Sequence, residues 1–179
     1  MFAKFGKGHI RYGLFFNWKS PGLEINDMGY QREADQIAEL AWSQYRIWEP
    51  FSIFRNLYIN LNQWRIWDYH GRHLVTGGNI NVHTQFKNYW ELSLGVNSNS
   101  ASFSKTALRG GPMLKEPASL NYWISMDTDQ RKKLAFSLGN SKSWSRYSHN
   151  HHNSLWSDIS YRPHNTLKFT LSPSLTRQQ

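Results

Sequence analysis

The 179-residue sequence contains no cysteine, which excludes disulfides and zinc sites built on thiolates. It also lacks an apolar run of about 20 residues, the length that a transmembrane helix requires. The first residues, Met1 to Gly6, lack the apolar segment of a signal peptide, so export would require a signal upstream of this sequence.

Acidic residues are also few: 12 Asp and Glu stand against 21 Lys and Arg, and the formal net charge is +9. The carboxylates are scattered and no Gly-x-Ser-x-Gly motif occurs, so the sequence gives little support to an enzyme. The basic residues fall mainly between the expected strands, and no Cys/His module accompanies them. We therefore predict no catalytic residue, no cofactor and no nucleic-acid partner.

Aromatic residues are abundant instead, with 9 Trp, 9 Tyr and 10 Phe, although the mean hydropathy is only -0.67. Such a chain needs a surface on which aromatic side chains are anchored, either a core or a membrane interface.

Alternation of apolar and polar side chains dominates the middle of the chain. In 76–87 the even positions include Ile80 and Val82, whereas the odd positions include Asn79, Asn81 and His83. Side chains alternate between the two faces of a strand, so this period of two predicts a strand with one apolar face. The same alternation predicts strands near 10–18, 51–67, 72–87, 90–96, 119–127, 134–139, 155–161 and 167–172.

The segment from Ala34 to Trp48 fits two patterns. Ala34, Ile37, Ala38 and Ala41 recur at helical spacing, whereas other positions alternate as in a strand. Periodicity alone leaves helix and strand equally supported. With that segment as a strand, the sequence predicts an all-β, antiparallel up-and-down meander of about nine strands in one domain over 1–179.

The expected connections alternate in length. Those at 49–50, 87–88, 128–131 and 162–165 are short, and those at 19–33, 68–73, 97–117 and 140–152 are mostly longer. Outer-membrane barrels have this layout, with short periplasmic turns and longer outer loops.

Three features favour lipid over a core against the apolar face. The strands are longer than the roughly 5–6 residues usual in globular proteins. The opposite face carries Asn, Ser and Gly rather than the charges of a solvated exterior. Aromatic residues lie near the strand ends, as in membrane girdles: Trp18, Trp48, Phe51, Trp67, Tyr89, Trp90 and Tyr161. The alternative is a soluble β-sandwich or barrel with the apolar face inside.

In a barrel, the polar face would line the lumen, for solute passage or glycan contact, or as a hydrogen-bond network that fills the barrel. The predicted lining residues are Asn56, Asn60, Asn62, Asn79, Asn81, His83, Gln85, Glu91, Asn97, Asn121 and Asp127. Basic residues expected on the long connections could contact lipopolysaccharide phosphates, or could serve only loop solubility. These residues are Lys105, Arg109, Lys115, Lys142 and Arg146.

Three further clusters contain residue types that can bind ligands. His149, His151 and His152 could bind a divalent metal, but we favour a solvated loop. Glu24, Asn26 and Asp27 offer oxygen ligands to Ca²⁺ without EF-hand spacing, and we favour local capping. Residues 109–112 could seat an anion on backbone amides, or could shape a long loop. We predict no metal.

Several motifs occur in an order that resembles one family: Leu23 to Tyr30, Trp48-Glu49-Pro50, Asn62-Gln63-Trp64, Gly77-Gly78-Asn79, Gln85 to Trp90, Leu108 to Pro112, Asn121-Tyr122-Trp123 and Arg131 to Leu134. It is the uncharacterised C-terminal β-barrel domain of large Gram-negative envelope proteins, which follows a domain similar to family-9 carbohydrate-binding modules. The resemblance implies an outer-membrane barrel and a strand at Ala34–Trp48, and it carries over no catalytic residue.

The sequence departs from that family in lacking the upstream domain, and it ends in Thr176-Arg177-Gln178-Gln179 without a terminal aromatic strand. Single-chain bacterial barrels have an even number of strands. We therefore expect a partial barrel that acts as membrane anchor or pore of a larger envelope protein, with lipid, lipopolysaccharide and glycan as partners. The alternatives are a soluble carbohydrate-binding sheet, or part of a hydrolase whose active site lies outside this chain.

Overall fold

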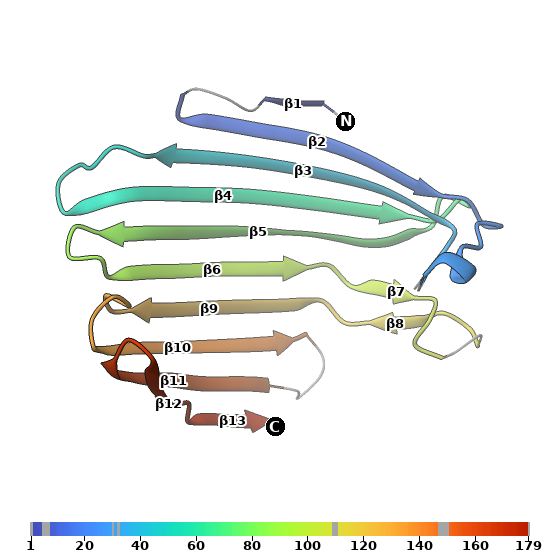
Figure 1. The fold of residues 1–179 in the computed structure, drawn as a ribbon. Coiled ribbons are helices and arrows are strands. Elements are labelled where there is room, and N and C mark those ends of the chain that lie inside the picture. The colour runs from blue at the N-terminus through green and yellow to red at the C-terminus, as the bar shows by residue number, and fades with distance from the viewer. Residues whose placement is uncertain are drawn as a thin grey trace.

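A computed structural model describes residues 2–4, 8–29, 31, 33–108, 111–146 and 151–178, with backbone alone for 2–4. Figure 1 shows one layer of strands lying side by side, with a small hairpin beyond one end of the layer. The layer is an eleven-stranded sheet, and the hairpin forms a separate two-stranded sheet. None of the helical segments within these residues is long and apolar enough to cross a membrane.

The strands of the main sheet follow the chain order, except that the last one pairs with the third from the end, and all pairings among the described residues are antiparallel. They are β1 (Phe2–Lys4), β2 (Ile10–Lys19), β3 (Gln36–Ile47), β4 (Phe54–Trp67), β5 (His73–Phe86), β6 (Glu91–Asn99), β9 (Ser119–Asp127), β10 (Leu134–Ser145), β11 (His151–His164), β12 (Leu167–Leu171) and β13 (Ser174–Gln178). The hairpin consists of β7 (Ser102–Ser104) and β8 (Leu114–Glu116), and the single 3-10 turn is η1 (Asn26–Met28). The predicted all-β antiparallel meander is confirmed.

The ambiguous segment from Ala34 to Trp48 forms a strand, β3. Gln36–Ile47 is hydrogen-bonded to β2 on one side and to β4 on the other. Pairing on both edges satisfies the backbone donors and acceptors of the segment without a helix. Pairing with the neighbouring strands therefore determines that this segment is a strand, which the spacing of its side chains did not decide.

Two predicted boundaries are wrong. The loop expected at 140–152 is strand on both sides of a short connection, because β10 continues to Ser145 and β11 begins at His151. Residues 97–117 are also not one loop, because β6 continues to Asn99 and the β7–β8 hairpin follows. Ser and Asn residues suggest loops, yet here they lie within paired strands.

The connections lie at two ends of the sheet (Figure 1). The turn end carries residues 48–53, 87–90, 128–133 and 165–166, and the loop end carries 20–35, 68–72, 100–118 and 146–150. The strict alternation in length is wrong, because 68–72 and 146–150 are no longer than 48–53. Only 20–35 and 100–118 make the loop end the larger one.

The sheet has no packed core on its apolar face. Among the described residues, only Leu74 and Ala135 are buried hydrophobic side chains. Large apolar side chains on one face of every main-sheet strand from β2 to β13 are 36% to 70% exposed: Ile10, Leu14, Phe16, Trp18, Tyr45, Leu61, Ile80, Leu94, Val96, Leu120, Ile124, Met126, Phe136, Leu138, Leu155, Ile159, Phe169, Leu171 and Leu175. The period of two thus places an apolar surface where no described element covers it.

The sheet is open. Within the described residues, β1 forms one edge and β12 with β13 forms the other, and no pairing joins them. The structure therefore shows an open antiparallel meander, and its place in a barrel stays a prediction.

Candidate functional site

The polar face brings the predicted lumen-lining residues together in rows. Asn60 is paired with Asn81, Asn62 with Asn79, and Asn97 lies between Asn79 and Asn121 in the register. Opposed side chains in such pairs lie close enough to interact directly. The side-chain amides do so by hydrogen bonds from Gln44 to Asn60 (2.8 Å), Asn60 to Asn81 (2.7 Å), Asn62 to Asn79 (2.6 Å), Asn81 to Asn79 (3.1 Å) and Asn97 to Asn121 (2.9 Å). We call these residues the amide ladder.

The other predicted lining residues lie on the same face, towards the turn end. His83 contacts the Ser93 hydroxyl at 2.9 Å and Asn81 Oδ1 at 3.1 Å. Gln85 donates to Glu91 at 2.8 Å, and the Asn56 side chain accepts from the Gln85 backbone. Asp127 lies opposite Glu91 in the register. Their shared face agrees with the expected arrangement, while their role in a lumen stays a prediction.

Tryptophans on this polar face lie opposite glycines of the next strand. The register pairs are Gly13 with Trp42, Trp64 with Gly77, Gly95 with Trp123, and Gly139 with Trp156. A Cβ on Gly95 would lie 2.8 Å from Cε2 of Trp123, and one on Gly77 or Gly139 would also collide with its indole. Each glycine therefore provides a seat for an indole that lies across the strand. The sequence signal was available, since glycine inside a strand marks close approach.

The predicted lipopolysaccharide contacts do not form one patch. Lys105 follows β7 and is paired with Asp35, whereas Lys115 is exposed on β8. Lys142 lies within β10, not in a loop, with its Nζ 5.1 Å from the Trp144 ring centroid. Arg146 follows β10 and donates its backbone N–H to Ala118. Arg109 lies outside the described residues, as does Gly110 of the proposed anion seat.

The two clusters considered as metal sites do not assemble within the described residues. His151 and His152 are adjacent in β11, so their side chains point to opposite faces, and His149 lies outside the described residues. At η1, Glu24 accepts the backbone N–H of Asn26 at 2.7 Å, and the Asn26 side chain accepts that of Gln31 at 3.1 Å. These bonds are local capping contacts of the kind that we favoured at this loop.

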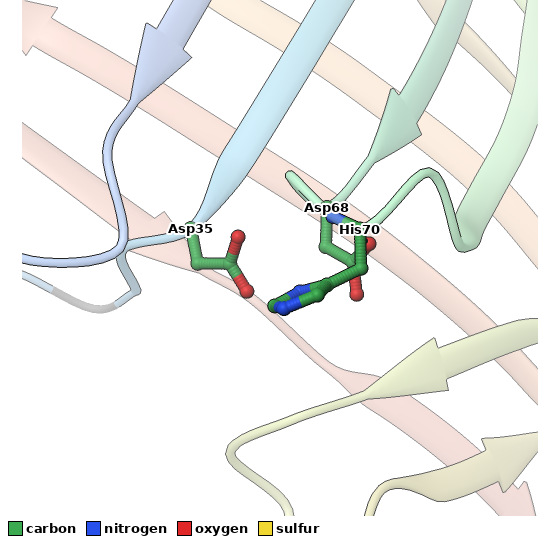
Figure 2. A group of neighbouring side chains, drawn as sticks. All are labelled: Asp35, Asp68 and His70. Carbon is green, nitrogen blue, oxygen red and sulfur yellow. Dashed lines mark hydrogen bonds between the residues drawn. The ribbon is translucent and has the colours of Figure 1, made fainter.

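The structure instead brings Asp35, Asp68 and His70 together, with ligand atoms within 4.8 Å of one another. Figure 2 shows the three side chains at the loop end, from the connections before β3 and after β4. Both carboxylates already accept hydrogen bonds from cations. Lys105 Nζ lies 2.8 Å from Asp35, and Arg72 Nε pairs with the almost fully buried Asp68.

These bonds make the cluster a latch rather than a cation site. The hydrogen bond from Lys105, followed by one from the Tyr69 backbone at 2.9 Å, lowers the pKa of Asp35. Burial raises the pKa of Asp68, but hydrogen bonds from Arg72 outweigh it and lower that pKa. We call Asp35, Asp68, Arg72 and Lys105 the loop-end latch. It joins the connections at 20–35, 68–72 and 100–118.

A second charged cluster lies at the turn end of the sheet. The Arg55 guanidinium lies 4.2 Å and that of Arg131 3.2 Å from the Tyr89 ring centroid, and Arg131 makes two 2.8 Å hydrogen bonds to Asp129. The hydrogen bond from Arg131 lowers the pKa of Asp129 to about 2. Tyr89 has a φ of 64°, a left-handed conformation that is unfavourable for a bulky residue. We call Arg55, Tyr89, Asp129 and Arg131 the turn-end clamp; no sequence pattern indicated it.

No curated protein and no solved structure matches the chain. A family model described as a domain of unknown function (DUF5916) matches residues 1–179. This match confirms that the chain is an uncharacterised domain, and it leaves the outer-membrane setting to be proposed. The chain belongs to the DUF5916 family.

Proposed function

We propose that this chain forms part of the membrane-embedded wall of an outer-membrane β-barrel, and so anchors a larger Gram-negative envelope protein. The observation that carries the proposal is the apolar face, which extends over every strand of the main sheet from β2 to β13 with no described element against it.

Water is an unfavourable neighbour for so large an apolar face. Burial of apolar surface contributes roughly 25 cal/mol per Å², and soluble monomers rarely expose apolar patches above a few hundred Å². Phe16 and Leu138, for example, are each more than half exposed, so in water they gain little stabilisation from burial. Lipid would supply the missing apolar contact, while the amide ladder faces a polar interior.

The ends of the strands support the same arrangement. Trp18 lies at the loop end of β2, whereas Trp90 and Tyr161 lie near the turn end, and all three are exposed. Tryptophan and tyrosine favour the two interfaces of a bilayer because their rings are apolar and carry one polar group. In a bilayer both sheet edges would have to be paired, since lipid satisfies no backbone hydrogen bond.

Vesicle flotation tests the proposal. The chain, refolded in the presence of phosphatidylcholine vesicles, should float with them and resist extraction by urea. Its gel migration should change on heating, as expected of a folded membrane sheet. A chain that purifies as a stable, detergent-free soluble monomer would rule out the membrane assignment.

A second candidate, glycan contact on the polar face, is favoured by the indole seats. Trp64, Trp123 and Trp156 are partly exposed there, beside amides that can donate and accept hydrogen bonds. Aromatic faces with neighbouring polar groups suit ligands that have both apolar and hydroxyl surfaces. Oligosaccharides should quench tryptophan fluorescence in the wild type and less so in Trp123→Phe, while Trp90→Phe, on the apolar face, should behave as the wild type. No saturable quenching with any oligosaccharide would exclude this candidate.

A further inference from the structure

A pocket of about 620 Å³ lies where the apolar face meets the turn end. Residues of two connections, 87–90 and 128–133, line it together with the start of β10. Its apolar wall consists of Trp90, Leu134 and Phe136, all exposed. Leu134 and Phe136 alternate with buried Ala135, which places them in the row that continues to Leu138 on the apolar face.

The rim of the pocket is cationic. Lys87, Arg131 and Lys132 line it, and Asp129 is its one lining carboxylate. Arg131 is engaged by Asp129 and Tyr89 in the turn-end clamp. Within the described residues, no carboxylate lies within 4.0 Å of the ammonium group of Lys87 or Lys132. Two exposed cations therefore stand at the mouth of an apolar pocket with no counter-charge in contact.

The backbone that carries both lysines is held in place. The N–H of Lys87 donates to the Ile53 carbonyl at 2.8 Å, and the N–H of Lys132 donates to that of Asp129 at 3.1 Å. The clamp holds Arg131 against Tyr89, which ties the two connections to each other. A site whose backbone is fixed beforehand loses less conformational entropy on binding.

We propose that this pocket binds an anionic phospholipid, with the phosphate between Lys87 and Lys132 and an acyl chain against Trp90, Leu134 and Phe136. The charge of the rim complements a phosphate, and the apolar wall complements the chain attached to it. This inference rests on the proposed membrane setting. It gives the turn end a specific headgroup contact, at the opposite end from the predicted lipopolysaccharide contacts.

The experiment is a titration of the folded chain in non-ionic detergent micelles with phosphatidylglycerol or phosphatidylcholine, read by native mass spectrometry. Wild type should bind phosphatidylglycerol more tightly than phosphatidylcholine. Lys87→Gln with Lys132→Gln should weaken phosphatidylglycerol binding by about 30-fold, at about 1 kcal/mol per lysine. Lys19→Gln with Lys115→Gln removes the same charge at the loop end and should leave the affinity unchanged.

Equal affinity for the two lipids, or an equal loss in the Lys19/Lys115 control, would overturn the lipid site. Glycerol phosphate that binds as tightly as the whole lipid would also overturn it, because the apolar wall would then play no part. Flotation separates this failure from that of the proposed function. If the chain floats equally with neutral and anionic vesicles, the membrane proposal stands and the lipid-site proposal fails. If the chain binds phosphatidylglycerol in micelles but floats with neither kind of vesicle, the lipid-site proposal stands and the membrane proposal fails.

Discussion

At the scale of single residues, the polar face depends on glycines that admit indoles. Because the register places each glycine opposite a tryptophan, the missing Cβ leaves room for the ring to lie across the next strand. The sequence shows which face each residue occupies, since alternation determines that locally. It does not show which tryptophan meets which glycine, because the pairing depends on how each connection sets the register.

Gly95→Ala should lower the free energy of unfolding by about 1–3 kcal/mol, because the new methyl group would overlap the Trp123 ring. Urea unfolding in detergent micelles measures the change. Gly22→Ala is the matched control, since nothing lies within 4 Å of the added atom there. In a Trp123→Ala background the Gly95 substitution should cost less; an undiminished cost would mean that the indole is not what the methyl group meets.

Asp129 makes the stability of the turn end depend on acid pH. Its pKa is lowered from 3.8 to about 2 by Arg131, so its contribution is present above pH 3.8 and disappears as the pH falls through about 2. Asp129→Asn and Arg131→Gln should therefore each flatten the loss of stability over that window, measured by thermal unfolding at successive pH values. Lys133→Gln, exposed in the same connection, should keep the wild-type slope. A wild-type slope in Asp129→Asn would show that this pair does not govern the transition.

At the scale of elements, the strands were predictable and their ends were not. Alternation places β5 and β6 correctly because each has a long apolar row. The end of β10 and the start of β11 carry Ser, Lys and His, whose composition suggests a loop although backbone pairing continues. The β7–β8 hairpin was missed because its strands have three residues each, too few to show a period.

The loop-end latch should hold that hairpin in place. Lys105→Met removes the ammonium that bonds both the carboxylate and the backbone carbonyl of Asp35. Loss of these charge-assisted bonds should lower local stability by about 1–2 kcal/mol and speed amide hydrogen exchange in residues 100–108 about 5- to 30-fold. Lys115→Met, exposed on the same hairpin, should change exchange little. Equal protection in wild type and Lys105→Met would show that the latch does not hold the hairpin.

At the scale of the whole molecule, the two faces of the sheet carry opposite chemistry with no second layer. This arrangement followed from the sequence, because the period of two persists through nearly every strand. Open edges also agree with the expected partial barrel. Which strands form the edges did not follow, since that depends on the order of pairing and not on the pattern within any strand.

Substitutions at two neighbouring residues of β9 compare the environments of the two faces of the sheet. Ile124→Lys should impair insertion into vesicles by about 2–4 kcal/mol near the bilayer centre, because the charge would face lipid. Ser125→Lys, one residue further on, faces the polar side and should be tolerated. The fraction of chain that floats with vesicles at increasing urea measures both. Equal tolerance of the two lysines would contradict the assignment of the apolar face to lipid.

The order of the strands also bears on how such a sheet grows. From β1 to β12 each strand of the main sheet pairs with the next one along the chain, except that β6 meets β9 across the inserted hairpin; β13 pairs with β11 rather than with β12. Closing a short connection costs little loop entropy, so every pairing step is local and can follow the previous one. A hairpin gained or lost by the gene would change the width of the sheet by two strands while leaving the remaining pairings intact. The hairpin would then be both the segment that evolution adds or removes and the segment that folds as one unit.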